Sequence, residues 1–306
     1  MARKKKFKNN AGVQVLIGIV ALVAIAFLGN LHDTNLLDSL SEVVQTDSLE
    51  SVDNSNNTST VTNVDGDLII DYIDVGQADS ILIRQGDATM LIDGGTSECK
   101  DDLLAFLSDK NIDKFEYVVG THTHEDHIGS LDDVVNRYDF DTFLFPNTTA
   151  TTKTFENLVL AVQQKNKKFT VPQVGQEYSL GEAKFQILAP NGDDYSSANN
   201  YSIVIKLTYG SNTFLFTGDA ESISESEILD KGFNVSADVL KVGHHGSTTS
   251  TSKEFLDAVS PKYAVISVGK DNSYNLPTKT TMEKLQEKNI PVYRTDEQGT
   301  IECISN

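Results

Sequence analysis

The chain has 306 residues and a formal net charge of −19, which argues against a protein that holds duplex nucleic acid on a broad basic surface. An apolar content of 39% is enough for a sizeable core and excludes a chain that is disordered throughout. The length leaves room for one large domain or two smaller ones.

The N-terminal thirty residues predict a membrane segment rather than part of the folded domain. Residues 1–10 are basic, and residues 11–29, "AGVQVLIGIVALVAIAFLG", carry no charge over a length that nearly spans a bilayer. Basic residues before the segment place the N-terminus inside and the rest of the chain outside. Ala24-Ile25-Ala26 keeps a cleaved signal peptide as the alternative, with a secreted product. Because the apolar run continues beyond Ala26, we favour a retained single-pass signal anchor in the cell membrane.

Residues 30–66 predict a flexible linker between this anchor and the domain that follows. The stretch "SVDNSNNTSTVTNVDGD" consists mainly of Ser, Thr, Asn and Asp, and it cannot bury enough apolar surface to offset its ordering entropy. The earlier stretch "NLLDSLSEVV" has helical apolar spacing, so a short amphipathic helix is an alternative for that part. The linker separates residues 11–29 from a single domain at residues 67–306.

The domain at residues 67–306 alternates strands with helices. The runs "LIIDYIDV", "SILIRQ", "TMLID" and "FEYVVGT" predict strands, and "DDLLAFLSDK" has the apolar spacing of a helix. Further along, "YSIVIKLTYG" and "TFLFTGD" predict a hairpin around "YGSN". Strands "ADVLKVG", "KYAVISVG", "PVYRT" and "TIECIS" then follow, with helices such as "ESISESEILDKG", "TSKEFLDAVS" and "TKTTMEKLQEKN" among them. This order predicts a layered α/β domain whose sheets are covered by helices.

The stretch "THTHEDHIGS" follows one of these strands and gathers metal-binding side chains: His122, His124, Asp126 and His127. Side chains two positions apart in an extended chain point the same way, so one loop presents two imidazoles together. Imidazole and carboxylate are ligands of zinc and similar divalent ions. Four ligands within six residues exceed what one ion takes from one loop, so the cluster predicts two adjacent ions. Surface histidines beside an acidic turn are the alternative.

Two distant segments carry further side chains of this kind. In "FLFTGDA" a strand delivers Asp219 directly after Gly218, where a carboxylate could bridge two ions, although capping of the helix near Glu221 is an equally ordinary use of Asp. In "LKVGHHGSTTS" a strand ends at His244 and His245. Neither segment is decisive alone, but together with the first cluster they favour a metal centre.

The order His-x-His-x-Asp-His, Thr-Gly-Asp and Gly-His-His-Gly-Ser resembles the metallo-β-lactamase superfamily. It is most similar to the ComEC-like branch, the secreted domain of competence DNA-uptake proteins and its stand-alone relatives, over about residues 67–285. The resemblance implies an αββα sandwich with the metal centre at the edge of its two sheets, and it places Asp93 at a buried position. The chain departs from many superfamily members because no histidine stands between His127 and His244. The ComEC-like branch usually lacks that ligand as well and has an Asn-x-x-Ser segment nearby, which here is Asn199 to Ser202.

The resemblance also implies how the ligands divide between two ions, zinc or manganese. His122, His124 and Asp219 would hold one ion. The other would take Asp126, His127, Asp219 and one of the paired histidines. We predict His244 as that ligand because it comes first after the strand, with His245 contacting phosphate or supporting the ligands. A hydroxide bridging the ions would be the nucleophile, oriented by Asp126. Ser247 and Thr248 would donate hydrogen bonds to the substrate, although ordinary turn chemistry explains these two residues equally well.

The implied function is hydrolysis of a phosphodiester such as DNA, by a membrane-anchored extracellular domain. The net charge of −17 over residues 67–306 weakens the case for a duplex nuclease without removing it. Two alternatives stay open: a phosphorylcholine-type esterase, and a catalytically weak module that binds DNA or a partner in a competence or envelope complex. The sequence does not indicate which protein partners the chain has.

Overall fold

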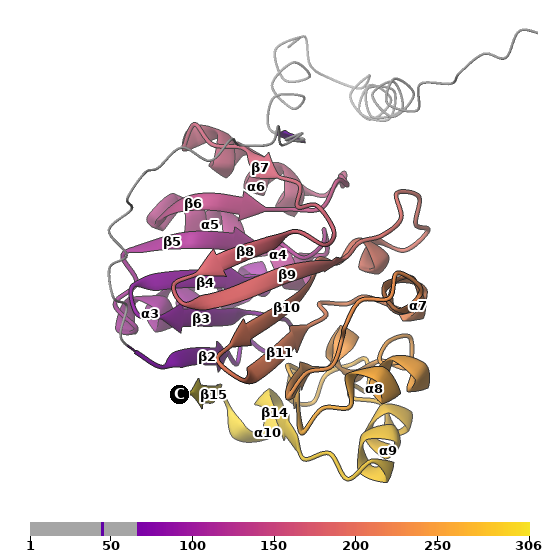
Figure 1. Cartoon of the computed structure of the whole chain (residues 1–306). Coiled ribbons are helices and arrows are strands. Elements are labelled where there is room, and N and C mark those ends of the chain that lie inside the picture. The colour runs from indigo at the N-terminus through magenta and orange to yellow at the C-terminus, as the bar shows by residue number, and fades with distance from the viewer. Residues whose placement is uncertain (1–43, 46–65) are drawn as a thin grey trace, which may run out of the picture. The chain divides into compact units, whose positions relative to one another are not determined.

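A computed structural model describes residues 44–45 and 66–306 (Figure 1). The predicted basic N-terminus and the membrane segment at residues 11–29 lie outside the described residues, as does most of the predicted linker. Among the helices of the described part, none has both the length and the apolar character needed to cross a bilayer.

The first sheet contains the early strands of the domain and the last one. Its order is β1 (Val44–Gln45), β7 (Phe169–Thr170), β6 (Asp139–Leu144), β5 (Lys114–Val119), β4 (Ala88–Ile92), β3 (Ile81–Gln85), β2 (Leu68–Tyr72) and β15 (Ile301–Ser305). Strands β2 to β4 form an antiparallel meander, and β15 pairs with β2 in the same sense. Strands β4 to β7 are parallel. Strand β1 falls within the stretch predicted as linker and pairs with β7.

The second sheet contains the middle and later strands. Its order is β14 (Val292–Arg294), β13 (Tyr263–Ile266), β12 (Val239–Lys241), β11 (Asn212–Phe216), β10 (Val204–Tyr209), β9 (Ala183–Ala189) and β8 (Glu177–Leu180). The predicted hairpin is confirmed, because β10 and β11 are antiparallel with Tyr209 opposite Asn212. Strands β11 to β14 run parallel.

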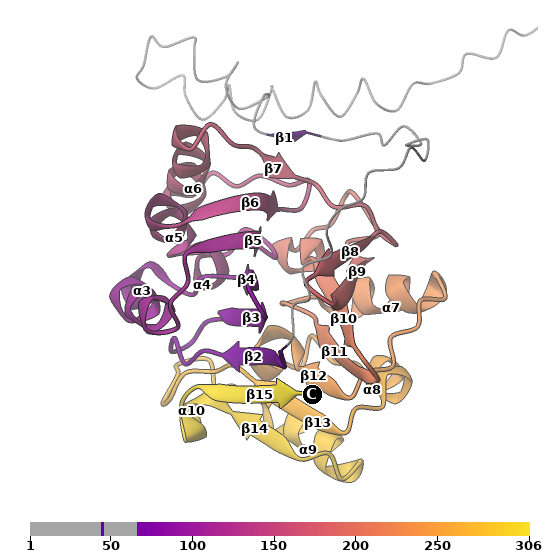
Figure 2. The ribbon, with the colours of Figure 1, turned by 60° about the vertical axis from the view of Figure 1, so that its left-hand side comes forward.

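Helices cover the outer face of each sheet, as Figure 2 shows. The first sheet carries α3 (Lys100–Asp109), α4 (Glu125–Ile128), α5 (Leu131–Arg137) and α6 (Lys153–Gln164), and the second carries α7 (Ser222–Asp230), α8 (Lys253–Val259) and α9 (Lys279–Glu287). The short α10 (Thr295–Gln298) leads from β14 to β15. Parallel neighbours need a crossover connection, and these helices provide it. The predicted layered α/β fold with two sheets is therefore confirmed.

Two apolar clusters hold these layers together. One lies between the sheets and includes Ile70, Ile83, Phe185 and Phe216, all almost fully buried. The other packs the second sheet against its helices. Burial on both faces explains why the inner strands read as nearly continuous apolar runs. Polar side chains therefore gather where the strands end, and there the candidate site forms.

Candidate metal centre

The predicted ligands meet at one edge of the sandwich, where parallel strands of both sheets end. The histidine-rich loop follows β5 in the first sheet, Asp219 follows β11 in the second, and the paired histidines follow β12. The paired histidines lie in the short turn η3 (Gly243–Gly246). Loops at the carboxyl ends of parallel strands commonly carry the functional groups of α/β proteins.

Main-chain hydrogen bonds fix the histidine-rich loop on its neighbours. The amide of Gly94 donates to the carbonyl of His127 at 2.7 Å, and the amide of Gly129 donates to the carbonyl of Gly95 at 2.8 Å. A Cβ at Gly129 would lie 2.3 Å from the amide nitrogen of Ser97, so no other residue fits there without movement of the backbone. The loop after β4 thus sets the position of the ligands.

Asp93 orients one of the ligands from behind. Its carboxylate accepts hydrogen bonds from the amide and the hydroxyl of Thr121, both at 2.8 Å, and lies 2.7 Å from Nδ1 of His127. Asp93 is buried, as the resemblance implied. With Nδ1 engaged in this way, Nε2 of His127 faces the centre. Such carboxylate–histidine contacts behind a metal ligand set the tautomer and the ring orientation.

A compact donor group combines Asp126, His127, Asp219 and His245, and their ligand atoms lie within 4.8 Å of one another. Oδ2 of Asp126 is 3.2 Å from Nε2 of His245, and Oδ2 of Asp219 is 3.3 Å from Nε2 of His127. Donors around one tetrahedral zinc ion lie roughly 3.3 Å apart, given bonds of about 2.0–2.1 Å. The four donors are therefore spaced as ligands of a common ion would be.

His122 and His124 form a second pair beside this group. Nε2 of His122 lies 3.1 Å from Nδ1 of His124, a spacing that also suits two ligands of one ion. The Nδ1 atom of His122 contacts the hydroxyl groups of Thr121 at 3.2 Å and of Ser202 at 3.4 Å. The Ser202 hydroxyl also accepts the amide of Asp219 at 3.1 Å, so Ser202 links this pair to the predicted bridging residue.

Asp219 lies between the ends of the two sheets and contacts three of the histidines: His127, His244 and His245. Gly218 before it has a φ of 51°, which turns the chain sharply at the end of β11. The alternative use of Asp219 as a helix cap is not what the structure shows, because the N-cap of α7 is Glu221. The Asp219 side chain is instead buried among the histidines.

The paired histidines differ in burial and direction. Both adopt left-handed backbone conformations, with φ of 50° at His244 and 51° at His245, which cost roughly 1–2 kcal/mol per residue. His245 is 2% exposed, and its Nδ1 lies 2.9 Å from the carbonyl of Ser267, so its Nε2 faces Asp126. His244 is 26% exposed, and its Nε2 is 3.7 Å from Oδ2 of Asp219. The geometry thus favours His245 as the ligand, whereas the sequence favoured His244.

Buried polar atoms without partners show that the centre fits a cation. Within the described residues, Nε2 of His127 and Oδ1 of Asp219 are buried and lack hydrogen-bond partners. Buried polar groups are nearly always paired, so atoms of this kind at converging donors point to a bound ion. The residues present therefore suit divalent metal ions, with imidazole and carboxylate as ligands.

The electrostatics of the centre favour a cation as well. Burial alone would lower the pKa of His127, but Asp219, Asp93 and Asp126 outweigh it and hold that pKa well above its usual value. Burial likewise opposes the charged form of His245, while Asp219 and Asp79 raise its pKa to about 10. Without metal, protons thus bind where ions would, and metal binding must release them.

The mouth of the centre carries hydroxyl groups. The hydroxyl of Ser247 lies 3.1 Å from that of Thr249, and Thr249 lies 2.9 Å from Nδ1 of His244. Thr248 is exposed beside them. Ser247 and Thr248 were predicted as substrate-binding residues and stay so, since nothing bound shows the contact. The sequence interpretation missed Thr249, which it did not distinguish from its neighbours.

Asn199, the first residue of the Asn-x-x-Ser segment that the resemblance indicated, also reaches the centre. It is 5% exposed, its Nδ2 donates to Glu221 at 3.1 Å, and its Oδ1 lacks a hydrogen-bond partner among the described residues. It lies 3.5 Å from Nδ1 of His244. Only the Asn-x-x-Ser spacing of "NNYS" in the sequence marks this position.

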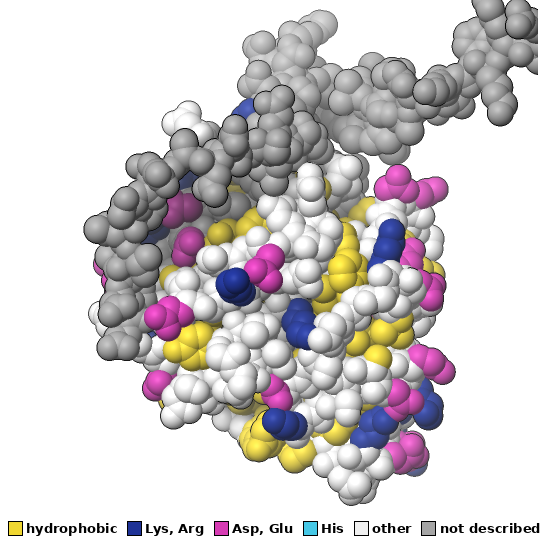
Figure 3. Space-filling model, in the orientation of Figure 1, with side chains coloured by type: hydrophobic (Ala, Val, Ile, Leu, Met, Phe, Trp, Pro, Cys, Tyr) yellow, Lys and Arg dark blue, Asp and Glu magenta, His cyan; other side chains and the backbone are white. Residues whose placement is uncertain are grey.

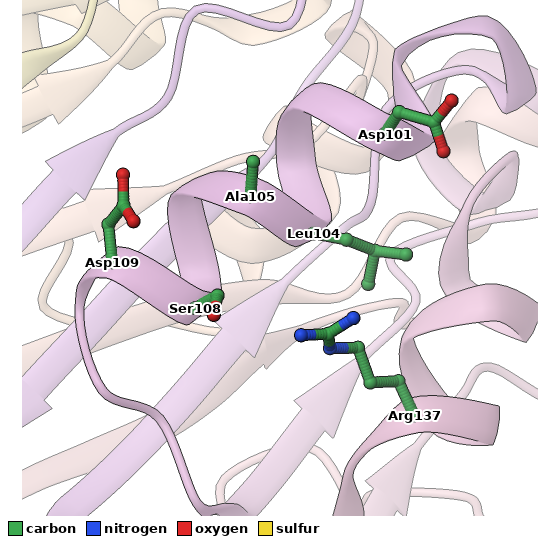
Figure 4. Close-up of a pocket in the computed structure, with 6 residues that line it drawn as sticks. All are labelled: Asp101, Leu104, Ala105, Ser108, Asp109 and Arg137. Atoms are coloured by element: carbon green, nitrogen blue, oxygen red, sulfur yellow. The ribbon is translucent and has the colours of Figure 1, made fainter.

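A separate hollow on the surface does not share these features. It lies between α3 and α5 and is lined by Asp101, Leu104, Ala105, Ser108, Asp109 and Arg137 (Figure 4). It holds none of the predicted ligands. The chemistry of the described part therefore lies at the histidine-rich edge rather than in this hollow.

Comparison with known proteins agrees with the geometry. A sequence model of the Metallo-beta-lactamase superfamily matches residues 73–270. The chain belongs to the metallo-β-lactamase superfamily. The solved structure of YhfI, a metallo-β-lactamase fold protein from Bacillus subtilis, matches with a TM-score of 0.52 and 15% identity over 78% of this chain and 100% of that one, which supports the fold.

The predicted resemblance to competence proteins is also confirmed. ComE operon protein 3 of Bacillus subtilis is 31% identical to this chain, and the match covers 76% of this chain and 32% of that protein. Competence protein ComA of Neisseria gonorrhoeae is 29% identical over 75% of this chain and 31% of that protein. The chain thus spans about a third of the length of the curated relatives it matches.

The different positions of the paired histidines predict different consequences of their loss. His245→Ala removes a buried donor and should weaken binding of divalent metal by roughly 100-fold or more, because truncating a ligand costs more than the ~10–100-fold of a supporting residue. His244→Ala should weaken it by less than 10-fold. Isothermal titration of the apo-protein with Zn²⁺ or Mn²⁺ measures both. The opposite order would restore the assignment that the sequence favoured.

Proposed function

We propose that this chain is a hydrolase that cleaves phosphodiesters with two divalent ions, zinc or manganese, at the outer face of the cell membrane. The observation that carries the proposal is the convergence of six ligand-type side chains from three separate segments on one edge of the sandwich, where four of them are buried while His124 and Asp126 reach the solvent. The six are His122, His124, Asp126, His127, Asp219 and His245. Two of their ligand-type atoms, Nε2 of His127 and Oδ1 of Asp219, are buried without a hydrogen-bond partner, as expected where an ion binds.

The residues divide between two neighbouring sites. His122 and His124 would hold one ion, and Asp126, His127 and His245 the other, with Asp219 shared by both. Two such ions lower the pKa of water toward neutrality and offset the charge of a phosphate. The chain's own contribution is placement: Asp93 fixes His127 from behind, and Ser202 fixes both His122 and the backbone of Asp219.

Side chains on the exposed rim of the centre would orient the substrate. Asp126 is 34% exposed at its side chain, so it reaches both the donor group and the solvent. His244 and Thr249 form a hydrogen-bonded pair beside Asp219, where they could contact a phosphate oxygen. Holding a scissile phosphate close to fixed groups accounts for a large share of catalysis in such sites.

The surface charge favours a strand end or a small ester over a long duplex. Figure 3 shows a face away from the histidines, on which lysine and arginine side chains are interspersed with acidic ones rather than gathered into a patch. Residues 67–306 carry a net charge of −17. Affinity for duplex DNA depends on several phosphate contacts to basic side chains. The resemblance to competence proteins supports DNA as the substrate, with contact limited to the metal centre. A phosphorylcholine-type ester is the second candidate.

Residues 11–29 would anchor the domain in the membrane as a single pass, with the hydrolase outside the cell. The basic residues 1–10 support this orientation through the positive-inside rule. Residues 30–66 would then set the reach of the domain from the bilayer.

Loss of a ligand should abolish cleavage. His122→Ala and Asp126→Ala should each reduce hydrolysis of bis(p-nitrophenyl) phosphate by at least ~100-fold, because misplacement of the reacting groups alone can cost that much. The p-nitrophenolate released reports the rate, and circular dichroism checks the fold. His32→Ala is the matched control, because His32 is the only histidine of the sequence that lies outside the histidine-rich loop and the His244–His245 pair.

Single-stranded DNA, duplex DNA and phosphorylcholine esters assayed in parallel identify the substrate class. If wild-type protein with two ions bound cleaves none of these compounds, the proposed hydrolase is wrong. A module that binds DNA or a protein partner then becomes the better account.

The membrane orientation has its own test. A reporter fused after Asn306 should react with a membrane-impermeant reagent in intact cells, because the anchor places everything after residue 29 outside. A reporter fused before Met1 should be protected. Protection of the C-terminal reporter would contradict the proposed orientation, and release of the domain into the medium would indicate cleavage of the N-terminal segment instead.

A further inference from the structure

A lysine lies fully buried beneath the metal centre. Lys241 is the last residue of β12, and none of its side chain is exposed. Its Nζ donates to Oδ2 of Asp79 at 2.8 Å and to the carbonyl of Val242 at 3.1 Å. Lysine is almost never fully buried unless it is paired, and burial of a charged pair costs solvation that its hydrogen bonds must offset. An interior pair at this place therefore calls for an explanation.

Asp79, the partner of this lysine, connects the ligand-bearing segments. Its amide donates to the carbonyl of Asp126 at 3.1 Å, and its carbonyl accepts the amide of Gly95 at 2.8 Å. Its Oδ1 lies 3.3 Å from Nδ1 of His245. The same residue thus touches the histidine-rich loop through its backbone and the last ligand through its side chain.

Asp79 also belongs to a second group of potential ligands. Asp79, Asp93 and His127 offer atoms within 4.8 Å of one another, all buried. The ammonium group of Lys241 already lies against Asp79, and Nδ1 of His127 is engaged by Asp93. A cation supplied by the chain thus lies where these carboxylates would otherwise attract another ion.

We propose that Lys241 and Asp79 are a positioning pair that holds His245 in place as a metal ligand. The carbonyl of Ser267 lies 2.9 Å from Nδ1 of His245, and Lys241 keeps the Asp79 carboxylate on the same side of the ring, with its Oδ1 3.3 Å from that nitrogen. Together they leave Nε2 of the ring facing Asp126 and Asp219. The ammonium group also balances one of the four buried or half-buried carboxylates of the centre. The proposal rests on the metal centre of the proposed function, but not on its substrate.

The alternative is that the pair only ties the two sheets together. Asp79 follows β2 in the first sheet and Lys241 ends β12 in the second, so a structural role is reasonable. The two roles differ in what they predict for metal binding. A structural pair should affect both ions equally through stability, whereas a positioning pair should affect only the ion held by His245.

The test replaces both partners at once, which leaves no unpaired buried charge. Full-length protein carrying Asp79→Asn and Lys241→Met is titrated with Co²⁺ and followed by its visible absorption, which reports the ligand field. One Co²⁺ should bind as in the wild type, and the other roughly 10–100-fold more weakly with a changed spectrum, as expected for loss of a residue that supports a ligand.

The control is a carboxylate–lysine pair outside the ligand group, in which the carboxylate of Asp71 is buried and the side chain of Lys110 is 25% exposed. The Asp71 side chain is 1% exposed and contacts Lys110 at 3.0 Å and Arg84 at 2.9 Å. Asp71→Asn combined with Lys110→Met should leave both Co²⁺ affinities and the spectrum unchanged. If this control changes them as well, the effect is general and the positioning role is wrong.

Wild-type affinity and spectrum in the Asp79/Lys241 double variant would overturn the proposal. If that variant does not fold, Asp79→Asn alone, judged on its folded fraction, must show the same selective loss, and unchanged binding overturns the proposal equally. If the wild-type protein binds two Co²⁺ ions but cleaves no phosphodiester, the proposed function is wrong. The proposed role of Asp79 and Lys241 in positioning His245 is not affected by that result. Failure of the wild type to bind a second ion would overturn both.

Discussion

The need to balance buried carboxylates at the junction of two sheets governs this structure. Asp93 and Asp219 are each 1% exposed, and Asp79 is 2% exposed. Carboxylates removed from water require cations or hydrogen bonds in compensation. Lys241 compensates one of them, the histidines surround the others, and the divalent ions that the family implies would complete the balance. Two backbone features bring these groups together: the close approach of the loops at Gly129 and the left-handed turn at His244 and His245.

This constraint also explains how the fold serves the site. The sheets pack face to face through apolar side chains and so bring the ends of β5, β11 and β12 to one edge. The ligands come from loops, but main-chain bonds between those loops leave them little freedom. Rigid support of this kind is what a metal centre requires, since ligand placement decides both affinity and reactivity.

Much of this was predictable from the sequence, because clustered histidines and strand periodicity are local signals. The histidine-rich loop and the hairpin around Gly210 were recognised in this way, whereas Asp219 was recognised only through its order with the other segments and the family resemblance. The choice between His244 and His245 was not predictable, because it depends on two left-handed residues that turn one ring inward. Asp79 and Lys241 lie 162 positions apart, and no local pattern joins them. The only signal was a lysine within an otherwise apolar strand.

The central claim is that the converging side chains hold a pair of divalent ions, and crystals grown with Mn²⁺ test it most directly. Anomalous difference maps should show two peaks at this edge, with Asp219 between them and Nε2 of His245 bound to the ion that His127 also binds. A single peak, peaks elsewhere on the surface, or no peak at these residues would contradict the account.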